Sequence, residues 1–83
     1  MKEALVVIDM QNDFIDGSLG TAEAQQIVSN VISKINAFSG DLYYTRDTHN
    51  ENYLDTLEGK KLPVVHCIKN TFGWEIQKDV WNV

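Results

Sequence analysis

Cysteine occurs once in this chain, as Cys67, and basic residues are scarce. A lone cysteine excludes an internal disulfide, which makes the cytoplasm the simplest compartment. Seven lysine and arginine residues stand against twelve aspartate and glutamate residues, for a net charge of −5. No basic run is present to neutralise phosphates, so nucleic acid and anionic membrane are not expected as partners.

Long apolar runs and targeting signals are also missing. The first three residues lead directly into an apolar run of strand length, which is too short for the hydrophobic region of a signal peptide. No apolar stretch is long enough to span a bilayer. Repeats, low-complexity tracts and linkers are absent as well. We therefore expect residues 1–83 to make one small domain at most.

The most informative feature that is present is the apolar run Leu5–Ile8, which ends at Asp9. Its residues are mostly β-branched, as is typical of a strand buried on both faces in a parallel sheet. Ligands of open α/β sheets bind just beyond the carboxyl ends of the strands. Asp9 is therefore either a functional carboxylate in a crevice or a solvated residue that caps the following turn. Position alone favours neither.

Helices and further strands are expected to alternate along the rest of the chain. An amphipathic helix should begin after the N-cap Thr21, with Glu23 in its first turn, and end at Gly40. The remaining expected elements are a strand over 42–47, a helical turn within 53–61, a strand over 62–68 and a helix over 74–81 with Trp74, Val80 and Trp81 in the core. This order predicts an α/β fold with a parallel sheet.

The expected elements do not make a complete domain. The chain stops at Val83 within the second expected helix, and three strands with two helices leave an apolar sheet edge exposed. We therefore expect the N-terminal portion of a larger α/β domain, or a chain that pairs with another chain.

Three polar side chains follow expected strands. Asp47 and His49 are two residues apart, so in an extended segment they project to the same side. His66 lies near the end of the strand expected over 62–68. One carboxylate and two imidazoles form a usual ligand set for a divalent metal, zinc above all. By itself, however, this short pattern is more typical of one surface and one core histidine.

Three further residues near the expected site have two interpretations each. Cys67 is expected to be a buried structural thiol rather than a nucleophile, because adjacent strand residues point to opposite faces and His66 takes the site face. Phe14 could form a stacking wall of the crevice or pack the loop onto the sheet. Gln11 could position a substrate or satisfy main-chain groups of the loop.

Three sequence blocks, taken together, resemble one family. Residues 7–14 (VIDMQNDF) resemble the N-terminal motif of the isochorismatase-like cysteine hydrolases. Residues 45–49 (TRDTH) and 63–75 (PVVHCIKNTFGWE) resemble the next two blocks of the nicotinamidase branch. The blocks occur in the family's order and cover nearly all of the chain, which makes the match specific.

The resemblance implies a three-layer α/β/α, Rossmann-like fold with a six-stranded parallel sheet of order 3-2-1-4-5-6. The chain would supply strands three, two and one, which is only the N-terminal half of the sheet. The first strand would then be central in the whole protein and paired on both sides, which agrees with its apolar character.

The resemblance also implies site residues. Asp9 matches the aspartate of a Cys–Asp–Lys triad, whereas the lysine and the nucleophilic cysteine of the family lie beyond the end of this chain. Cys67 matches a structural cysteine. Asp47, His49 and His66 match the ligands of a divalent metal, with zinc preferred over manganese or iron. Glu58 lies near the place of a further ligand found in some members, at a different spacing.

The function implied is hydrolysis of a small amide, nicotinamide to nicotinate and ammonia, with Phe14 and Gln11 as substrate-binding residues. One alternative is an isochorismatase or another small-substrate cysteine hydrolase. The other is an inactive fragment or a module that only binds, because two of the three triad residues are absent. The expected partners are the small amide and either further copies of the chain or the missing C-terminal half.

Overall fold

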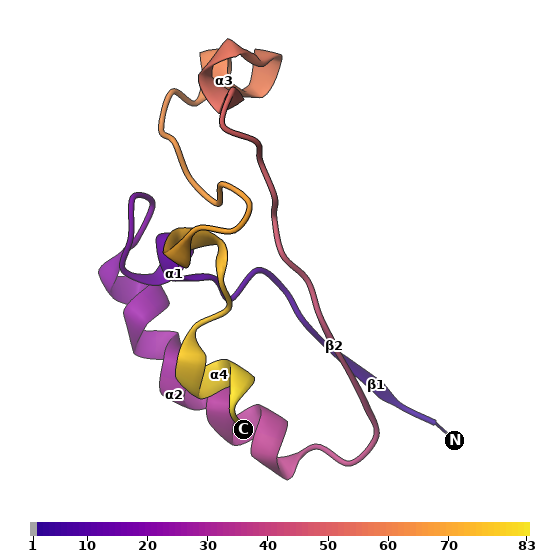
Figure 1. Ribbon diagram of the computed structural model, residues 1–83. Coiled ribbons are helices and arrows are strands. Elements are labelled where there is room, and N and C mark those ends of the chain that lie inside the picture. Colours follow the sequence, from indigo (N-terminus) through magenta and orange to yellow (C-terminus); the bar gives the residue numbers. More distant parts are fainter. Residues whose placement is uncertain (1) are drawn as a thin grey trace.

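The computed structural model describes residues 2–83 (Figure 1). Along the chain the elements are β1 (Ala4–Val7), α1 (Asn12–Ile15), α2 (Ala22–Ala37), β2 (Asp41–Tyr44), the 3-10 helix η1 (Tyr53–Asp55), α3 (Leu57–Lys61), the 3-10 helix η2 (Phe72–Trp74) and α4 (Lys78–Trp81). Within the described part of the chain, no helix is both long and apolar enough to cross a bilayer.

The two strands form a parallel pair joined through the long helix α2. Leu5 lies opposite Leu42, and Val7 lies opposite Tyr44. This β–α–β unit confirms the predicted α/β fold with a parallel sheet. Among residues 2–83, β1 is paired along one edge only, and the sheet contains these two strands alone.

Helix α2 begins where the sequence predicts and ends earlier. The Thr21 side chain accepts a hydrogen bond from the Ala24 N–H at 3.0 Å, which confirms it as the N-cap. The prediction that Gly40 ends the helix is wrong, because Phe38 is already extended as the C-cap. Gly40 is needed for a different reason. Its φ is +155°, and a Cβ there would lie 2.6 Å from the Glu3 carbonyl oxygen, where the chain enters β2.

The core lies on one face of the two-stranded sheet. Val7 of β1 packs in one cluster with Ile35 of α2 and Val80 of α4, and Figure 1 shows these two helices side by side. Val6 and Ile8 point to the opposite face and are 48% and 66% exposed. The prediction that the first strand is buried on both faces is therefore wrong for this chain, since its helices cover only one face.

The strand predicted over 62–68 is not formed. Its main-chain groups bond elsewhere: the Val64 N–H donates to the Leu62 carbonyl, and the Val65 carbonyl accepts from the Ser18 hydroxyl at 2.8 Å. A single parallel bridge joins Ile68 to His49. Apart from this bridge, the described residues offer the segment no neighbouring strand with which to form a ladder. The described residues thus hold strands one and two of the expected sheet, and not strand three.

The helix predicted over 74–81 is shorter than expected. Ile76 forms an antiparallel bridge with Gln11, and this pairing holds the chain before the helix in an extended conformation. The Gln77 side chain then accepts hydrogen bonds from the N–H groups of Asp79 and Val80, so that α4 starts at Lys78. Val80 is buried as predicted, whereas Trp81 is exposed and rests against the Tyr44 ring.

The segment between β2 and residue 68 forms a projecting lobe, with α3 far from the sheet in Figure 1. The helical turn predicted within 53–61 is confirmed as η1 followed by α3. Thr56 caps α3 by accepting from the Gly59 N–H at 3.0 Å. The lobe carries Tyr53, which is completely buried.

Candidate metal centre

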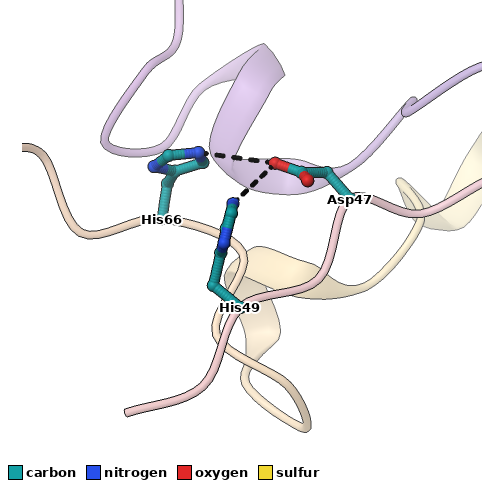
Figure 2. Close-up of side chains that lie close together, drawn as sticks. All are labelled: Asp47, His49 and His66. Carbon is teal, nitrogen blue, oxygen red and sulfur yellow. Dashed lines mark hydrogen bonds and ion pairs between the residues drawn. The ribbon is translucent and has the colours of Figure 1, made fainter. Parts of the chain in front are cut away.

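Three side chains of the segment between β2 and residue 68 converge on one point (Figure 2). Asp47 Oδ2 lies 3.0 Å from His49 Nε2 and 3.4 Å from His66 Nε2. One ligand atom from each residue lies within 4.8 Å of the others. The structure thus brings together the three residues that the sequence selects as metal ligands.

A short stretch of main-chain pairing sets this arrangement. The His49 N–H donates to the Cys67 carbonyl at 2.9 Å, and the Lys69 N–H donates to the His49 carbonyl at 2.8 Å. These two bonds hold the segment after β2 parallel to the segment that carries His66. Asp47 and His49 then share a side of the extended chain that faces His66.

The environment of His66 determines which of its nitrogens is free. The ring is 4% exposed, and its Nδ1 lies 2.7 Å from the Val64 carbonyl oxygen. A carbonyl only accepts hydrogen bonds, so we assign the ring proton to Nδ1. Nε2, which lies 3.4 Å from Asp47 Oδ2, is then the nitrogen through which a neutral ring would bind a metal.

Aromatic rings surround the two histidines. The Tyr53 ring lies edge-on to both, with centroids 4.6 Å from His49 and 5.0 Å from His66. Its hydroxyl donates to the Leu62 carbonyl at 2.8 Å. Burial raises the pKa of Tyr53, and the nearby carboxylates of Glu58 and Asp47 raise it further. Tyr53 therefore forms a neutral wall of the centre.

Glu58 lies on the far side of His49. Its Oε2 is 3.7 Å from His49 Nδ1, whereas Asp47 faces Nε2 of the same ring. The Glu58 side chain is 65% exposed. In this arrangement Glu58 stands behind one ligand candidate instead of joining the other three.

The chemistry of the three converging atoms fits a divalent ion. Two imidazole nitrogens and one carboxylate oxygen suit zinc, and also manganese or iron(II). Three protein ligands leave coordination positions open, as in catalytic sites. Asp47, His49 and His66 would hold the ion.

Asp9 lies directly beyond the end of β1 and is tied to the end of β2. Its φ of 54° places it in the left-handed region, which aspartate tolerates better than most residues. The Thr45 hydroxyl donates to Asp9 Oδ1 at 2.7 Å and accepts from the Asp9 N–H at 3.0 Å. The structure thus fixes the carboxylate at the strand end, and its catalytic role stays a prediction.

The two residues assigned to substrate binding lie in different surroundings. Phe14 is half-buried in α1, with its ring centroid 5.6 Å from that of His66. Gln11 is completely buried, and its amide bonds to main-chain groups of Asp47 and Trp74. Contact of either residue with a substrate stays a prediction.

Cys67 is buried, as predicted for a structural thiol. Burial raises the pKa of the Cys67 thiol to about 12, with smaller contributions from the negative charges of Asp13, Asp47 and Asp9. A thiol with this pKa stays protonated at neutral pH, so it is a poor nucleophile.

Sequence reasoning missed three residues that line the centre or hold neighbouring residues in place. Tyr53 lies in a mixed polar segment whose periodicity marks no buried position. Thr45 and Asp13 bond to residues far away in the sequence, Asp9 and Cys67. No local pattern in the sequence could have identified these partners.

The arrangement can be compared with known proteins. The family model of the isochorismatase domain matches residues 3–81. The chain belongs to the isochorismatase domain family. The parallel strands and their helices have the isochorismatase-like α/β fold, in agreement with the resemblance of the three sequence blocks.

Two solved structures support this membership of the isochorismatase family. Pyrazinamidase of Pyrococcus horikoshii in complex with zinc is 34% identical, with a TM-score of 0.71 over 92% of this chain. N-carbamoylsarcosine amidase from Thermoplasma acidophilum is 30% identical, with a TM-score of 0.72 over 96% of this chain. The match covers 45% and 46% of those chains, so this chain spans about half their length. The comparison with curated proteins found no match.

Proposed function

We propose that the chain is the metal-binding part of an isochorismatase-family amidohydrolase that acts on a small aromatic amide, with nicotinamide as the preferred candidate. The convergence of Asp47, His49 and His66 carries this proposal. The similar structure of a pyrazinamidase in complex with zinc supports it. Isochorismate is less favoured as a substrate, because family members that act on it often lack this ligand set.

The proposed reaction needs a thiol, a base and water. A cysteine sulfur bonds to the amide carbonyl carbon, and Asp9 takes the thiol proton and delivers it to the departing nitrogen, so that ammonia leaves. Water then cleaves the thioester and restores the thiol with release of the carboxylic acid. A lysine of the family triad stabilises the charged pair. Asp9 is suited to the role of base because the Thr45 hydroxyl holds its carboxylate at the strand end.

The metal and the aromatic wall would orient the substrate. Asp47, His49 and His66 would hold a divalent ion, whose positive charge would favour a substrate with a ring nitrogen lone pair, as in nicotinamide. Phe14 lies against His66 and would flank the substrate ring from α1. Both contacts act on the aromatic ring and leave the amide free for chemistry at the Asp9 end.

This chain does not itself supply the nucleophile. Its one cysteine is Cys67, which is buried and has a pKa of about 12. We therefore expect the 83 residues alone to show no amidase turnover, and the activity belongs to the chain together with the other half of the family domain. Within residues 2–83 one edge of β1 has no partner strand, and this edge with the exposed Val6 and Ile8 offers an apolar surface for that half, or for a second copy. A cytoplasmic location agrees with the single cysteine.

Metal analysis of the purified chain tests the centre. Wild-type chain equilibrated with zinc and then desalted should retain about one ion per chain, and Asp47→Ala should retain almost none. Glu51→Ala serves as the control, because it removes an exposed carboxylate from the same loop outside the centre. Equal zinc content in wild type and Asp47→Ala would contradict the proposed ligand set.

Ligand binding tests the substrate class. Nuclear magnetic resonance titration of the zinc-loaded chain should show nicotinamide binding at least about tenfold more tightly than benzamide, which lacks the ring nitrogen. The difference should vanish in Asp47→Ala. Equal affinity for the two amides would exclude the proposed contact between the ring nitrogen and the ion.

A further inference from the structure

Gln11 holds the chain that carries Asp47. The Gln11 side chain is completely buried, and its Oε1 accepts a hydrogen bond from the Asp47 N–H at 2.9 Å. Its Nε2 donates to the Asp47 carbonyl at 2.9 Å and to the Trp74 carbonyl at 2.7 Å. Both protons of the Gln11 amide are thus donated to main-chain oxygens. The same amide bonds to both the N–H and the carbonyl of Asp47.

Asp13 acts in the same way on the chain that carries His66. Its Oδ2 accepts a hydrogen bond from the N–H of Cys67, the next residue, at 2.8 Å. Cys67 has a φ of 51°, a conformation that costs free energy and persists only where the surroundings hold it. The carboxylate of Asp13 supplies such a constraint directly after His66.

We infer that Gln11 and Asp13 are positioning residues of the metal centre, which join the Asp47 segment and the His66 segment to one turn of chain after β1. This inference rests on the proposed metal site. It gives the two residues a role other than contact with substrate or metal. Residues 11 and 13 flank the start of α1, so one short turn fixes two segments that are 19 residues apart at Asp47 and His66.

The physical reason lies in the stability of the two loops. The two ligand segments share a single parallel bridge and lie outside any continuous ladder, so their own pairing constrains them little. Buried amide and carboxylate groups that bond to main chain hold such segments in one conformation. Loss of outer partners that bond to ligand side chains lowers metal affinity by typically about 10-fold to 100-fold, and partners that hold the ligands' main chain should act in the same direction.

The test compares zinc affinity in matched variants of the 83-residue chain. Gln11→Met removes the amide at similar side-chain volume. Asn12→Leu is its control, because Asn12 is also buried in this turn and donates to a main-chain carbonyl, that of Phe72, which carries no ligand. Asp13→Leu removes the acceptor for Cys67, and Asp13→Asn restores an oxygen there. Zinc affinity is measured by chelator competition, and the geometry of the centre by the visible spectrum of the cobalt(II)-loaded chain.

We expect Gln11→Met and Asp13→Leu to weaken zinc binding by at least about tenfold and to alter the cobalt spectrum. Asn12→Leu should lower the melting temperature similarly and leave zinc affinity within about threefold of wild type. Asp13→Asn should recover most of the affinity. Wild-type affinity and an unchanged spectrum in Gln11→Met would overturn the inference while leaving the metal site intact.

A measurement on the wild type tests the inference even if the variants do not fold. Zinc binding and the positioning bonds stabilise each other if they are coupled, so zinc should slow hydrogen exchange of the Asp47 and Cys67 amides at least about tenfold more than that of Ala24 in α2. Uniform slowing across these amides would contradict the inference. A wild-type chain that binds no zinc would overturn the proposed function and this inference with it.

Discussion

The Thr45 hydroxyl joins the ends of the two strands. It donates to Asp9 Oδ1 at 2.7 Å and accepts from the Asp9 N–H at 3.0 Å, so a residue beyond β2 holds a residue beyond β1. The bond pair accounts for the left-handed conformation of Asp9, because it satisfies both the main chain and the carboxylate at that turn. The position of the proposed base thus depends on the pairing of the two strands.

Replacement of Thr45 by valine should therefore destabilise the chain. Thr45→Val keeps the side-chain shape and removes both hydrogen bonds to Asp9, and we expect the free energy of unfolding to fall by about 1 kcal/mol. Thr45→Ser is the control, because it keeps the hydroxyl. Urea denaturation measures the difference, and a valine variant as stable as the serine variant would show that the bonds contribute nothing.

Stability should fall at alkaline pH because of Cys67. In the unfolded chain the thiol ionises near its ordinary pKa of 9.0, whereas in the folded chain its pKa is raised to about 12. The folded state holds the proton more tightly, so this contribution is fully present below pH 9 and is lost as the pH rises towards 12. The raised pKa of Tyr53 acts in the same direction.

Urea titrations between pH 8 and pH 11 measure this effect. Wild type should lose more stability over that range than Cys67→Ala, in which the thiol is absent. The two slopes should differ most between pH 9 and pH 11. Parallel curves for the two proteins would show that the folded thiol ionises as readily as the unfolded one.

Replacement of Gly59 by alanine should destabilise the lobe. Gly59 is buried in α3, and a Cβ there would overlap the main-chain carbonyl of Tyr53. The helix would have to move away from η1, which we expect to cost about 1–3 kcal/mol. Helix propensity alone predicts the opposite sign, a gain of about 1 kcal/mol for alanine over glycine.

Thermal and urea unfolding distinguish these two outcomes. Ser33→Ala is a matched control, because Ser33 is an exposed position in α2 where no packing changes, and its effect should stay within about 0.5 kcal/mol. A Gly59→Ala variant more stable than wild type would mean that the lobe adapts to the added methyl group. In that case the contact with Tyr53 does not constrain α3.

Glu58 should contribute much less to zinc binding than Asp47. Glu58 Oε2 lies 3.7 Å from Nδ1 of His49. Asp47 Oδ2, in contrast, lies close to the Nε2 atoms of both His49 and His66. We expect Glu58→Gln to lower zinc affinity less than about tenfold and Asp47→Asn to lower it more than about 100-fold. Chelator competition measures both variants, which make the same carboxylate-to-amide change. Equal losses would place Glu58 among the ligands.

Local sequence patterns predicted the parts of the fold that depend on local physics. The apolar run of β1, the Thr21 cap and the spacing of Asp47 and His49 all follow from residues within one or two turns of one another. The helical turn at Tyr53 to Lys61 is of the same kind. Sequence resemblance supplied the family, which the match over residues 3–81 confirms.

Residues 62–68 show where this reasoning stops. Their composition is that of a strand, but a strand needs a partner, and the groups that bond to Val65 and Cys67 come from Ser18 and Asp13. The same holds for residues 74–77, where the bridge between Ile76 and Gln11 prevents the predicted helix from starting early. The conformation of these segments depends on partners 47 to 65 residues away in the sequence. No local stretch of sequence contains both a segment and its partner.

The sequence by itself determined the first strand and the crossover helix, because period and capping are properties of neighbouring positions, and the resemblance of its three blocks to one family selected the three metal-ligand candidates. Only the tertiary structure decided that Nε2 of His66 faces Asp47, that the Tyr53 ring packs against both histidines and that the Gln11 amide bonds to main-chain groups. Those outcomes depend on which donor meets which acceptor once distant segments are packed. The hydrogen bonds from Gln11 to Asp47 and Trp74 exist only in the folded chain.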